Sequence, residues 1–452
     1  MKILVCVKVI KGEINPFDES ALECALRLSD DVTVVSMGAA NCTDALKAIT
    51  RLGAKAVLIS DCVFAGSDTL ATSYILSQAI KSMEYDLILC GRKSVDGDTA
   101  QTGPMLSQRL NLPLAENALS VDGSGDLLNV KTRTGEEKIH LPALVTLERS
   151  YVLRFPSIFS KAGEVKVITH DDFKCDIKKC GLSGSPTRVL ESFESERGRR
   201  KCKFISMDEL FSVVDELMKK STPQEDKTAE YTGEKLKSAW AVGDEVYEKA
   251  QQIADEVVRI DKSSGKEIAQ RALREKPSVI LWNADEWGRK NAAIAAVILE
   301  TGLCADCTAL ETDGENLFMY RPAHGGSITA KIKCLTLPQT ATVRTKSKSA
   351  DIIVSGGRGV SDSMDNLHEL AKRLNAQLGA SRGLVDANGA PYDMQIGLSG
   401  KTVSPKIYIA VGISGAVHHT CAIEGSGSVI AINPDKNARI FDYADYGIID
   451  KL

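Results

Sequence analysis

The sequence predicts an α/β protein with three doubly wound domains, two of which are related to each other. Strands alternate with helices along the chain, one block of elements recurs later in the sequence, and glycine-rich turns follow strands near the C-terminus. Such an alternation favours parallel sheets that are covered by helices on both faces.

The composition is that of an ordinary globular protein. The chain has 452 residues, of which 43% are hydrophobic and 26% are charged, and its formal net charge is −4. This length suggests about two to four domains. The charge gives no electrostatic reason for binding nucleic acid. No apolar stretch approaches the roughly 18 residues of a membrane-spanning helix, so we expect no membrane insertion.

The expected location is a reducing cytoplasm. Residues 1–7 predict a first strand, and the small-residue cleavage site of a signal peptide does not follow it. The 12 cysteines are too dilute for a disulfide scaffold, and several of them lie inside apolar runs as small hydrophobic residues.

The first domain is predicted from four apolar runs that alternate with helical patterns. We expect strands at 3–9, 32–36, 56–59 and 87–90, separated by helices at 19–28, 43–52 and 67–81. Short alternating segments between 119 and 147 surround a turn at 122–126, and these antiparallel strands are expected to extend the sheet.

One block of elements occurs twice. Its first copy is the strand 86–89, a helix ending near Leu112 and the segment 141–146, and its second copy is 278–281, a helix ending near Leu303 and 337–342. Corresponding positions are 192, 191 and 196 residues apart, which predicts two related α/β domains. The alternative is the general likeness of any two α/β units.

Two segments separate the halves of the chain. Residues 206–220 have the apolar spacing of an amphipathic helix, and residues 221–237 are polar and charged, as in a solvated linker. The predicted domains are therefore 1–220, 238–345 and 346–452, with the linker at 221–237.

The C-terminal domain contains two glycine-rich turns after strands. The strand at 351–354 leads into 355–359 and then a helix at about 362–378, and the strand at 407–411 leads into 412–415 and a helix that carries His418 and His419. Glycines in this position let backbone N–H groups approach a phosphate closely. Two such turns in one domain favour a nucleotide site at a topological switch point.

Six stretches of this domain resemble the FAD domain of the electron transfer flavoprotein α subunit. They lie at 355–359, 379–382, 396–401, 410–416, 431–433 and 444–447. The N-terminal half resembles the β subunit at 5–8, 15–19 and 90–104, with its closing stretch at 185–187 and the helix at 206–220. The chain thus resembles a β subunit fused to an α subunit through residues 221–237.

Three departures from the family pattern stand out. The strand and helix that open the α subunit are not found between Lys237 and Gln251, so residues 238–345 resemble a shortened first α domain. Leu398 stands where the family often has Gln. The segment 155–164 keeps the apolar anchor that docks acyl-CoA dehydrogenases but lacks the lysine run that usually follows it.

The resemblance implies roles for residues around the flavin. His419 is expected beside N1 and O2, Arg382 over the ring face, and Ser399, which replaces the family's usual Thr, near N5 or O4. A donor or positive charge beside N1 and O2 stabilises a half-reduced flavin, as one-electron transfer requires. Without its motif, His419 reads as a helix histidine with a local hydrogen bond. The other implied FAD-binding residues are Arg358, Ser381, Ile396, Gly397, Gly400, Ser414, Gly415, Ala416, Asn433 and Asp450.

The resemblance also implies a second nucleotide in the N-terminal domain. It is a structural AMP in simple members of the family, and in electron-bifurcating members a second FAD that accepts hydride from NADH. Residues 96–104 and 321–326 resemble the bifurcating type, which favours the second FAD. Alternatively, Asp98 and Thr99 merely cap a helix. The implied binding residues are Cys6, Asn15, Pro16, Phe17, Met37, Asp98, Thr99, Ala100, Gln101, Thr102 and Gly103.

The expected function is therefore electron transfer through FAD, between a flavin dehydrogenase (acyl-CoA dehydrogenase-like or other) and a second redox partner. A bifurcating protein would add NADH-dependent flavin oxidoreductase activity. The alternative from another class is a non-redox module that binds an adenine nucleotide.

Two further groups of residues are interpreted as structural and not functional. Cys304 and Cys307 are expected to be two buried thiols and not metal ligands, because no second pair at zinc-site spacing accompanies them. Trp282 and Trp287 are expected to pack in the core.

Overall fold

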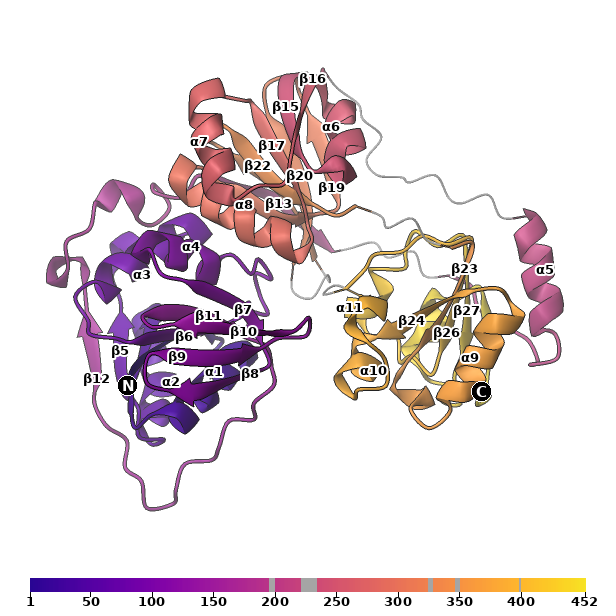
Figure 1. The fold of residues 1–452 in the computed structure, drawn as a ribbon, viewed down its shortest axis with the longest axis horizontal. Helices are drawn as coiled ribbons and strands as arrows, with labels where there is room; N and C mark the ends of the chain where they lie inside the picture. The colour runs from indigo at the N-terminus through magenta and orange to yellow at the C-terminus, as the bar shows by residue number, and fades with distance from the viewer. Residues whose placement is uncertain (195–199, 221–233, 324–327, 346–349, 398–399) are drawn as a thin grey trace. The chain divides into compact units, whose positions relative to one another are not determined.

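The computed structural model describes residues 1–194, 200–220, 234–323, 328–345, 350–397 and 400–452. It divides into two compact units (Figure 1). Unit 1 consists of Met1–Ser192, Tyr231–His324 and Ala330–Val343, and unit 2 consists of Phe193–Glu230, Gly325–Thr329 and Arg344–Leu452. The predicted α/β class is confirmed. The three predicted domain boundaries stay predictions, and the expected linker lies mostly outside the described residues.

The first sheet of unit 1 is parallel and has seven strands in the order β12-β5-β4-β1-β6-β11-β7. The strands are β1 (Lys2–Val7), β4 (Asp31–Met37), β5 (Lys55–Ile59), β6 (Leu87–Gly91), β7 (Leu114–Ala118), β11 (Ala143–Leu147) and β12 (Val165–Ile168). The helices beside it are α1 (Pro16–Leu28), α2 (Thr43–Thr50), α3 (Thr69–Ile80) and α4 (Thr102–Leu110).

Both faces of this sheet are covered. Ile3 and Val5 of β1 belong to the core under α1 and α2, whereas Leu4 and Cys6 belong to the core under α3 and α4. Because successive side chains of a strand point to opposite faces, a strand buried on both sides must be apolar at every position. This requirement explains the continuous apolar runs from which these strands were predicted.

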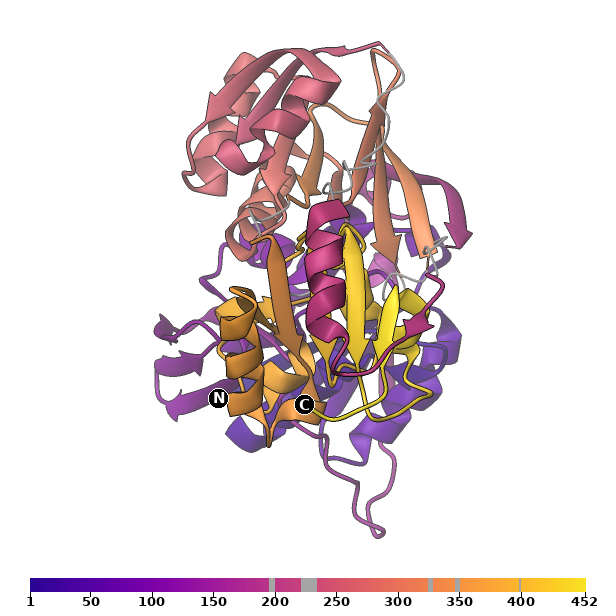
Figure 2. The ribbon, with the colours of Figure 1, turned by 90° about the vertical axis from the view of Figure 1, so that its right-hand side faces the viewer.

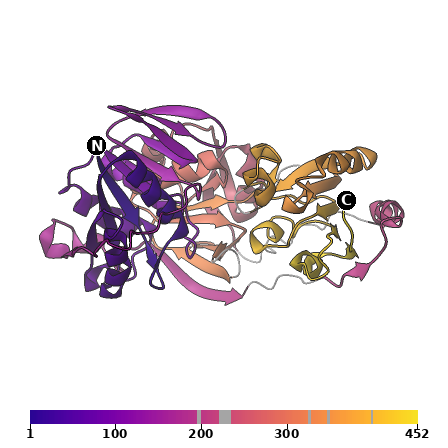
Figure 3. The ribbon, with the colours of Figure 1, turned by 90° about the horizontal axis from the view of Figure 1, so that it is seen from below.

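The hairpin strands between 119 and 147 do not extend this sheet, so that expectation is wrong. β8 (Ser120–Ser124), β9 (Leu127–Lys131) and β10 (Glu136–His140) form a separate antiparallel sheet, seen in purple in Figure 3. Val121, Leu128 and Val130 bury one face of it in the core that contains α1. Alternation along a strand reveals a half-buried face but does not identify the neighbouring strand.

The second large sheet of unit 1 has five parallel strands in the order β16-β15-β17-β22-β18. They are β15 (Leu236–Val242), β16 (Ala254–Ile260), β17 (Val279–Asn283), β18 (Leu303–Cys307) and β22 (Gln339–Val343). α6 (Tyr247–Ile253) covers one face, and α7 (Gly265–Glu275) and α8 (Glu286–Leu299) cover the other.

β15 and α6 correct another expectation, because a strand and a helix do lie between Lys237 and Gln251. The sequence pattern missed α6 for a physical reason. α6 has only seven residues after the one-turn 3₁₀ helix Asp244–Val246. Two turns are too short to display a helical period.

The two large sheets of unit 1 share one topology, as the repeat predicts. The strand order β4-β1-β6-β11-β7 in the first corresponds to β16-β15-β17-β22-β18 in the second. In both, a threonine of the fourth strand accepts a hydrogen bond from the backbone of the fifth. Asn117 N donates to Thr146 Oγ1 over 2.9 Å, and Asp306 N donates to Thr342 Oγ1 over 2.8 Å.

A third, four-stranded sheet in the order β13-β21-β20-β19 accompanies the second large sheet. Its strands are β13 (Thr187–Glu194), β19 (Ala309–Thr312), β20 (Leu317–Ala323) and β21 (Ile328–Cys334). Met105 of α4 is buried in the same core as Ala292 and Ala296 of α8. The two halves of unit 1, one built on the first large sheet and the other on the second, therefore pack together through these helices.

Unit 2 is built on a parallel sheet in the order β14-β28-β27-β26-β23-β24-β25. Its strands are β14 (Lys203–Phe204), β23 (Ile352–Gly356), β24 (Gln377–Ser381), β25 (Gln395–Ile396), β26 (Ile407–Val411), β27 (Ser428–Ile432) and β28 (Tyr446–Ile448). The helices are α5 (Leu210–Lys220), α9 (Met364–Arg373), α10 (Arg382–Asp386) and α11 (Val417–Thr420).

The predicted helix at 206–220 forms as α5 and packs on the sheet of unit 2, as Figure 2 shows. Leu210 and Val214 are buried in the same core as Ile407 and Ile409. An amphipathic pattern shows which face of a helix is buried but not which sheet covers it. None of the helices in the described parts of the chain has the length and apolarity needed to span a membrane.

We predict that Thr342→Val destabilises unit 1 by about 1–3 kcal/mol, because the substitution removes the hydroxyl that accepts a buried hydrogen bond from Asp306 N. Urea unfolding followed by tryptophan fluorescence measures this, since all three tryptophans, Trp240, Trp282 and Trp287, lie in unit 1. Thr33→Val in β4 is the matched control and is expected to change stability by less than about 0.5 kcal/mol. Equal midpoints for both variants would contradict the prediction.

Candidate functional site

The carboxyl edge of the sheet in unit 2 brings most of the expected FAD-binding residues together. From β23 the chain moves to β24 and β25 on one side, and then returns to β26, β27 and β28 on the other. The crossover direction therefore changes between β23 and β26. In open parallel sheets, ligands bind outside the carboxyl ends of strands at such a switch point.

The two glycine-rich turns meet backbone to backbone at this point. Gly357 N donates to the Val411 carbonyl oxygen over 2.7 Å, and Gly359 N donates to that of Gly412 over 3.2 Å. A Cβ at position 357 would lie 2.1 Å from the Gly412 carbonyl oxygen, and Gly412 itself has a φ of +61°. These contacts require glycine.

Three expected residues lie at the neighbouring strand ends. The Arg358 side chain passes so close to Gly383 that a Cβ there would be 3.0 Å from its Cγ. Ser381 ends β24 and caps α10 by accepting a hydrogen bond from Leu384 N over 3.4 Å. Arg382 pairs with Asp386, with 3.1 Å between Nε and Oδ2. Two guanidinium groups thus follow the ends of β23 and β24, and the last residue of β24 caps α10.

The other side of the switch point contributes residues after β26, β27 and β28. Asn433 Nδ2 donates to the Ile413 carbonyl oxygen over 2.9 Å, which ties the end of β27 to the second glycine turn. Gly415 has a φ of +82°, and a Cβ there would lie 2.2 Å from Ile440 N. Ser414 and Ala416 are exposed, as is Asp450, which follows β28.

His419 is buried, with 5% of its surface exposed. Its Nδ1 lies 3.0 Å from the Ile396 carbonyl oxygen, and its Nε2 lies 2.8 Å from the Tyr408 hydroxyl. Since a carbonyl can only accept, the neutral ring carries its proton on Nδ1 and accepts from Tyr408 at Nε2. Burial lowers the pKa of His419 to about 4.

The segment after β25 is the least complete part of the site. Gly397 N donates to the Lys401 carbonyl oxygen over 3.2 Å, and Gly400 N donates to that of Gly397 over 3.0 Å. Ser399 and Leu398 lie outside the described residues. The sequence analysis missed Tyr408, which a tyrosine within the apolar run 407–411 could have signalled.

The expected second group of residues gathers at the carboxyl edge of the first sheet in unit 1. Cys6 is buried near the end of β1, and Met37 ends β4. Asn15 precedes α1, which opens with Pro16 and Phe17. The Asn15 side chain donates to the Lys93 carbonyl oxygen over 2.9 Å and accepts from Val95 N over 3.2 Å. It thereby joins the start of α1 to the segment after β6.

Residues 98–101 form the turn that leads into α4. Asp98 and Ala100 have φ angles of +52° and +55°, and Lys93 pairs with Asp98 over 2.7 Å. Thr99 lies between them, and Thr102 and Gly103 open α4. Gln101 is only 3% exposed, and its side chain donates to the Leu303 carbonyl oxygen over 3.1 Å. The Gln101 amide therefore joins the two halves of unit 1.

A buried carboxylate that sequence reasoning missed lies beside this group. Asp18 accepts from Lys8 N over 2.8 Å and from Gly91 N over 3.0 Å, which links the ends of β1 and β6. Burial raises the pKa of Asp18 to about 7, although these hydrogen bonds oppose the rise. Its place within the stretch 15–19 was the available signal.

The cysteine pair and the tryptophan pair that were interpreted as structural are packed as expected. Cys304 and Cys307 are free, buried thiols in β18. The Trp282 ring is fully buried and lies 6.2 Å from that of Trp287. Within the part of the chain that the structure describes, no group of three or more His, Cys, Asp or Glu is arranged to hold a metal ion.

We predict that His419 stays neutral down to about pH 5 in flavin-free protein, whereas the hydrogen bond that the His170 ring donates to the Asp61 carboxylate raises the pKa of His170. An unfolded histidine binds a proton near pH 6.5, so unit 2 loses up to about 3 kcal/mol of stability as the pH falls from 6.5 to 4. NMR of protein with ¹⁵N-labelled histidines measures both titrations, with His419→Gln and His170→Gln as assignment controls. A His419 signal that titrates above pH 6 would contradict the prediction.

Comparison with known proteins finds the same family along most of the chain. A sequence model of the electron transfer flavoprotein domain matches residues 3–172 and 238–365, and a model of the electron transfer flavoprotein FAD-binding domain matches residues 347–424. One domain model therefore matches both halves of unit 1.

Individual relatives match different parts of the chain. The electron transfer flavoprotein subunit alpha of Thermoanaerobacterium thermosaccharolyticum is 41% identical over 234 residues, and the match covers 41% of this chain and 71% of the relative. Subunit beta of the same organism is 41% identical over 193 residues, covering 39% and 74%. The protein FixB of Azotobacter vinelandii is 34% identical over 294 residues, covering 49% and 82%. The chain therefore belongs to the electron transfer flavoprotein family, and it joins regions similar to the beta and alpha subunits in one polypeptide.

Proposed function

We propose that the chain transfers electrons between a flavin dehydrogenase and a second redox partner through an FAD held at the carboxyl edge of the sheet in unit 2. The observation that carries this proposal is the backbone contact of the two glycine turns between β23 and β26. Turns that carry no side chains at these positions let a nucleotide approach the backbone closely, at the place where ligands bind in open α/β sheets.

The surrounding residues fit the group. Arg358 would supply charge to the phosphates, with Ser381, Ser414 and Asn433 as hydrogen-bonding groups around the cofactor. Ile396, Gly397, Gly400, Gly415 and Ala416 would provide the backbone that lines it, and Asp450 would lie at its far end. Arg382 would lie over the flavin ring, and Ser399 would set the potential near N5 or O4.

His419 would influence the flavin through its own protonation. In the structure, both ring nitrogens already have partners within unit 2, and burial disfavours the charged ring. A negative charge placed beside the ring would oppose this effect and raise the pKa of His419. We therefore assign to His419 and Tyr408 the task of holding or releasing one proton as charge develops nearby. FAD supplies the one-electron chemistry when it is bound.

The second nucleotide is proposed to be FAD, with NADH as the hydride donor. Gly97, Thr99 and Ala100 are small and partly exposed, which leaves room for a ring to approach. The alternative is AMP, which the same turn would also hold, since the start of α4 suits a phosphate of either nucleotide. His324, Gly325 and Gly326, which belong to the stretch that favoured the bifurcating type, lie outside the described residues.

We also propose a dock for the dehydrogenase at residues 152–159. Val152, Phe155, Ile158 and Phe159 are 85%, 95%, 85% and 87% exposed. Four large apolar side chains exposed on one loop mark a protein interaction site. Because the lysine run that usually follows is missing, the partner is expected to present an apolar and not an acidic surface.

The FAD site is tested with Gly357→Ala. The new Cβ would overlap the Gly412 carbonyl oxygen, and such overpacking costs about 1–3 kcal/mol. FAD binding should therefore weaken by roughly tenfold to a hundredfold. Gly163→Ala is the control, because its Cβ would meet Thr50 only at 3.5 Å. Fluorescence titration measures both. Purified wild-type protein that shows no flavin absorbance after incubation with FAD would favour the non-redox module.

The second nucleotide is tested by counting flavins per chain after saturation with FAD. We expect two in the wild type, with reduction by NADH. At an FAD concentration too low to fill the weakened site of unit 2, we expect one in Gly357→Ala, because that substitution lies in unit 2 and leaves the N-terminal group of residues unchanged. Chromatography of the released nucleotides supplies the count. One flavin together with one tightly bound AMP in the wild type, and no reaction with NADH, would contradict the second FAD.

The dock is tested with Phe155→Ser combined with Phe159→Ser. We expect slower flavin reduction by the dehydrogenase that a pull-down recovers with the wild-type chain, because the apolar contact area is lost. Leu273→Ser is the matched control, since Leu273 is 53% exposed on α7, away from this loop. Undiminished reduction of the double variant would exclude the loop as the dock.

A further inference from the structure

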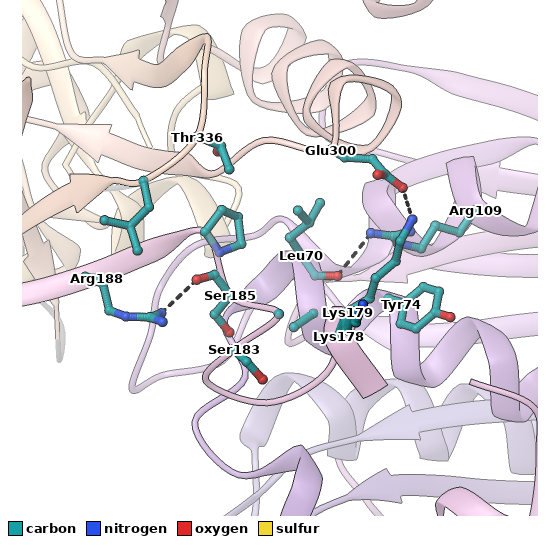
Figure 4. Close-up of a pocket in the computed structure, with 14 residues that line it drawn as sticks. Leu70, Tyr74, Arg109, Lys178, Lys179, Ser183, Ser185, Arg188, Glu300 and Thr336 are labelled. Carbon is teal, nitrogen blue, oxygen red and sulfur yellow. Dashed lines mark hydrogen bonds and ion pairs between the residues drawn. The ribbon is translucent and has the colours of Figure 1, made fainter. Parts of the chain in front are cut away.

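A pocket of about 220 Å³ lies in unit 1, apart from both groups of expected nucleotide-binding residues. It opens between α3, the end of α4, the segment 178–188 and the residue after α8, Glu300 (Figure 4). The segment 178–188 is fixed in place by Asp68, whose carboxylate accepts from Thr187 N over 3.1 Å and from Thr187 Oγ1 over 2.7 Å. The wall is therefore built by the fold and not by a free loop.

The lining of the pocket is strongly cationic. The lining contains one carboxylate, that of Glu300, and four cationic side chains, those of Arg109, Lys178, Lys179 and Arg188. It therefore carries an excess of three positive charges, in a chain whose net charge is −4. Lys179 and Glu300 form an ion pair. A concave wall lined by one sign of charge concentrates ions of the opposite sign.

The two guanidinium groups are held by neutral acceptors. Arg109 donates to Ser73 Oγ over 3.0 Å and to the Leu70 carbonyl oxygen over 3.2 Å. Arg188 donates from Nη1 to the Ser185 carbonyl oxygen over 2.7 Å. These contacts fix the positions of both groups without neutralising them. Burial lowers the pKa of Arg109, which shows that its charge is partly removed from water.

The rest of the lining suits a small molecule with an apolar body. Figure 4 shows Arg109 and Arg188 on opposite sides of the pocket, with Leu70 between them. Pro186 and Leu335 add further apolar surface, and Ser183 adds a hydroxyl. A dianion matches the excess charge better than a single carboxylate does, and arginine is well suited to phosphate.

We propose that this pocket binds a small phosphate ester. Its walls come from both related halves of unit 1, since Tyr74 and Arg109 belong to the first and Glu300 and Thr336 to the second. A bound phosphate would compete with Glu300 for Lys179 and would hold the two halves together. Binding to the folded state alone raises the stability of unit 1 with ligand concentration.

The test is isothermal titration calorimetry of the full chain, saturated with its cofactors, with glycerol 3-phosphate as the probe. Acetate at the same ionic strength is the control anion. We expect saturable binding of one glycerol 3-phosphate per chain and none of acetate. Lys178→Glu should weaken binding by about tenfold or more, because hydrogen bonds to charged groups contribute this much. Lys178 is exposed, so this variant is expected to fold.

Lys47→Glu, an exposed charge reversal on α2, is the matched variant and should bind the probe as the wild type does. Arg109→Gln gives a second test at the inner wall, with its folding checked by tryptophan fluorescence. The proposal is overturned if wild-type protein shows no saturable binding or binds acetate equally well. It is also overturned if Lys178→Glu binds like the wild type or if Lys47→Glu weakens binding to the same extent.

Discussion

Parallel pairing of the strands is the constraint on which both candidate sites depend. In a parallel sheet every strand ends at the same edge, so residues far apart in sequence meet there once the strand order is set. In unit 2 this brings Gly357, Ser381, Gly412 and Asn433 to one edge, although they span residues 357–433. The close contact of Gly357 with Gly412 is possible only because β23 and β26 are neighbours.

The same constraint explains what the sequence could predict. Strands buried on both faces must be largely apolar, so β1, β5 and β6 were visible as continuous runs. The glycine turns after two of the C-terminal strands were visible because each directly follows such an apolar run. Elements that depend on distant partners were not. The sequence could not show that β8–β10 form their own sheet or that α5 packs on the sheet of unit 2.

Chemical environment was harder to predict than position, because it depends on neighbours from several elements. Three carboxylates illustrate this point. Burial raises the pKa of Asp18 and of Glu116 to about 7. Burial also acts to raise that of Glu23, yet hydrogen bonds from Arg154 and Arg27 lower it to about 2. No pattern in the sequence around position 23 places Arg154 beside it, since 131 residues separate the two.

The repeat in unit 1 shows that two sheets of one topology can have different residues at their carboxyl edges. In the first sheet, the segment after β6 turns through Asp98 and Ala100, which both have positive φ. At the corresponding edge of the second sheet, Lys262 after β16 pairs with Glu245 over 2.8 Å and with Asp285 over 3.4 Å. Glu245 follows β15 and Asp285 follows β17, so side chains there join the ends of three strands. Equivalent strands thus end in different residues in the two sheets. The candidate nucleotide site therefore depends on the turn residues of the first sheet and not on the fold that both sheets share.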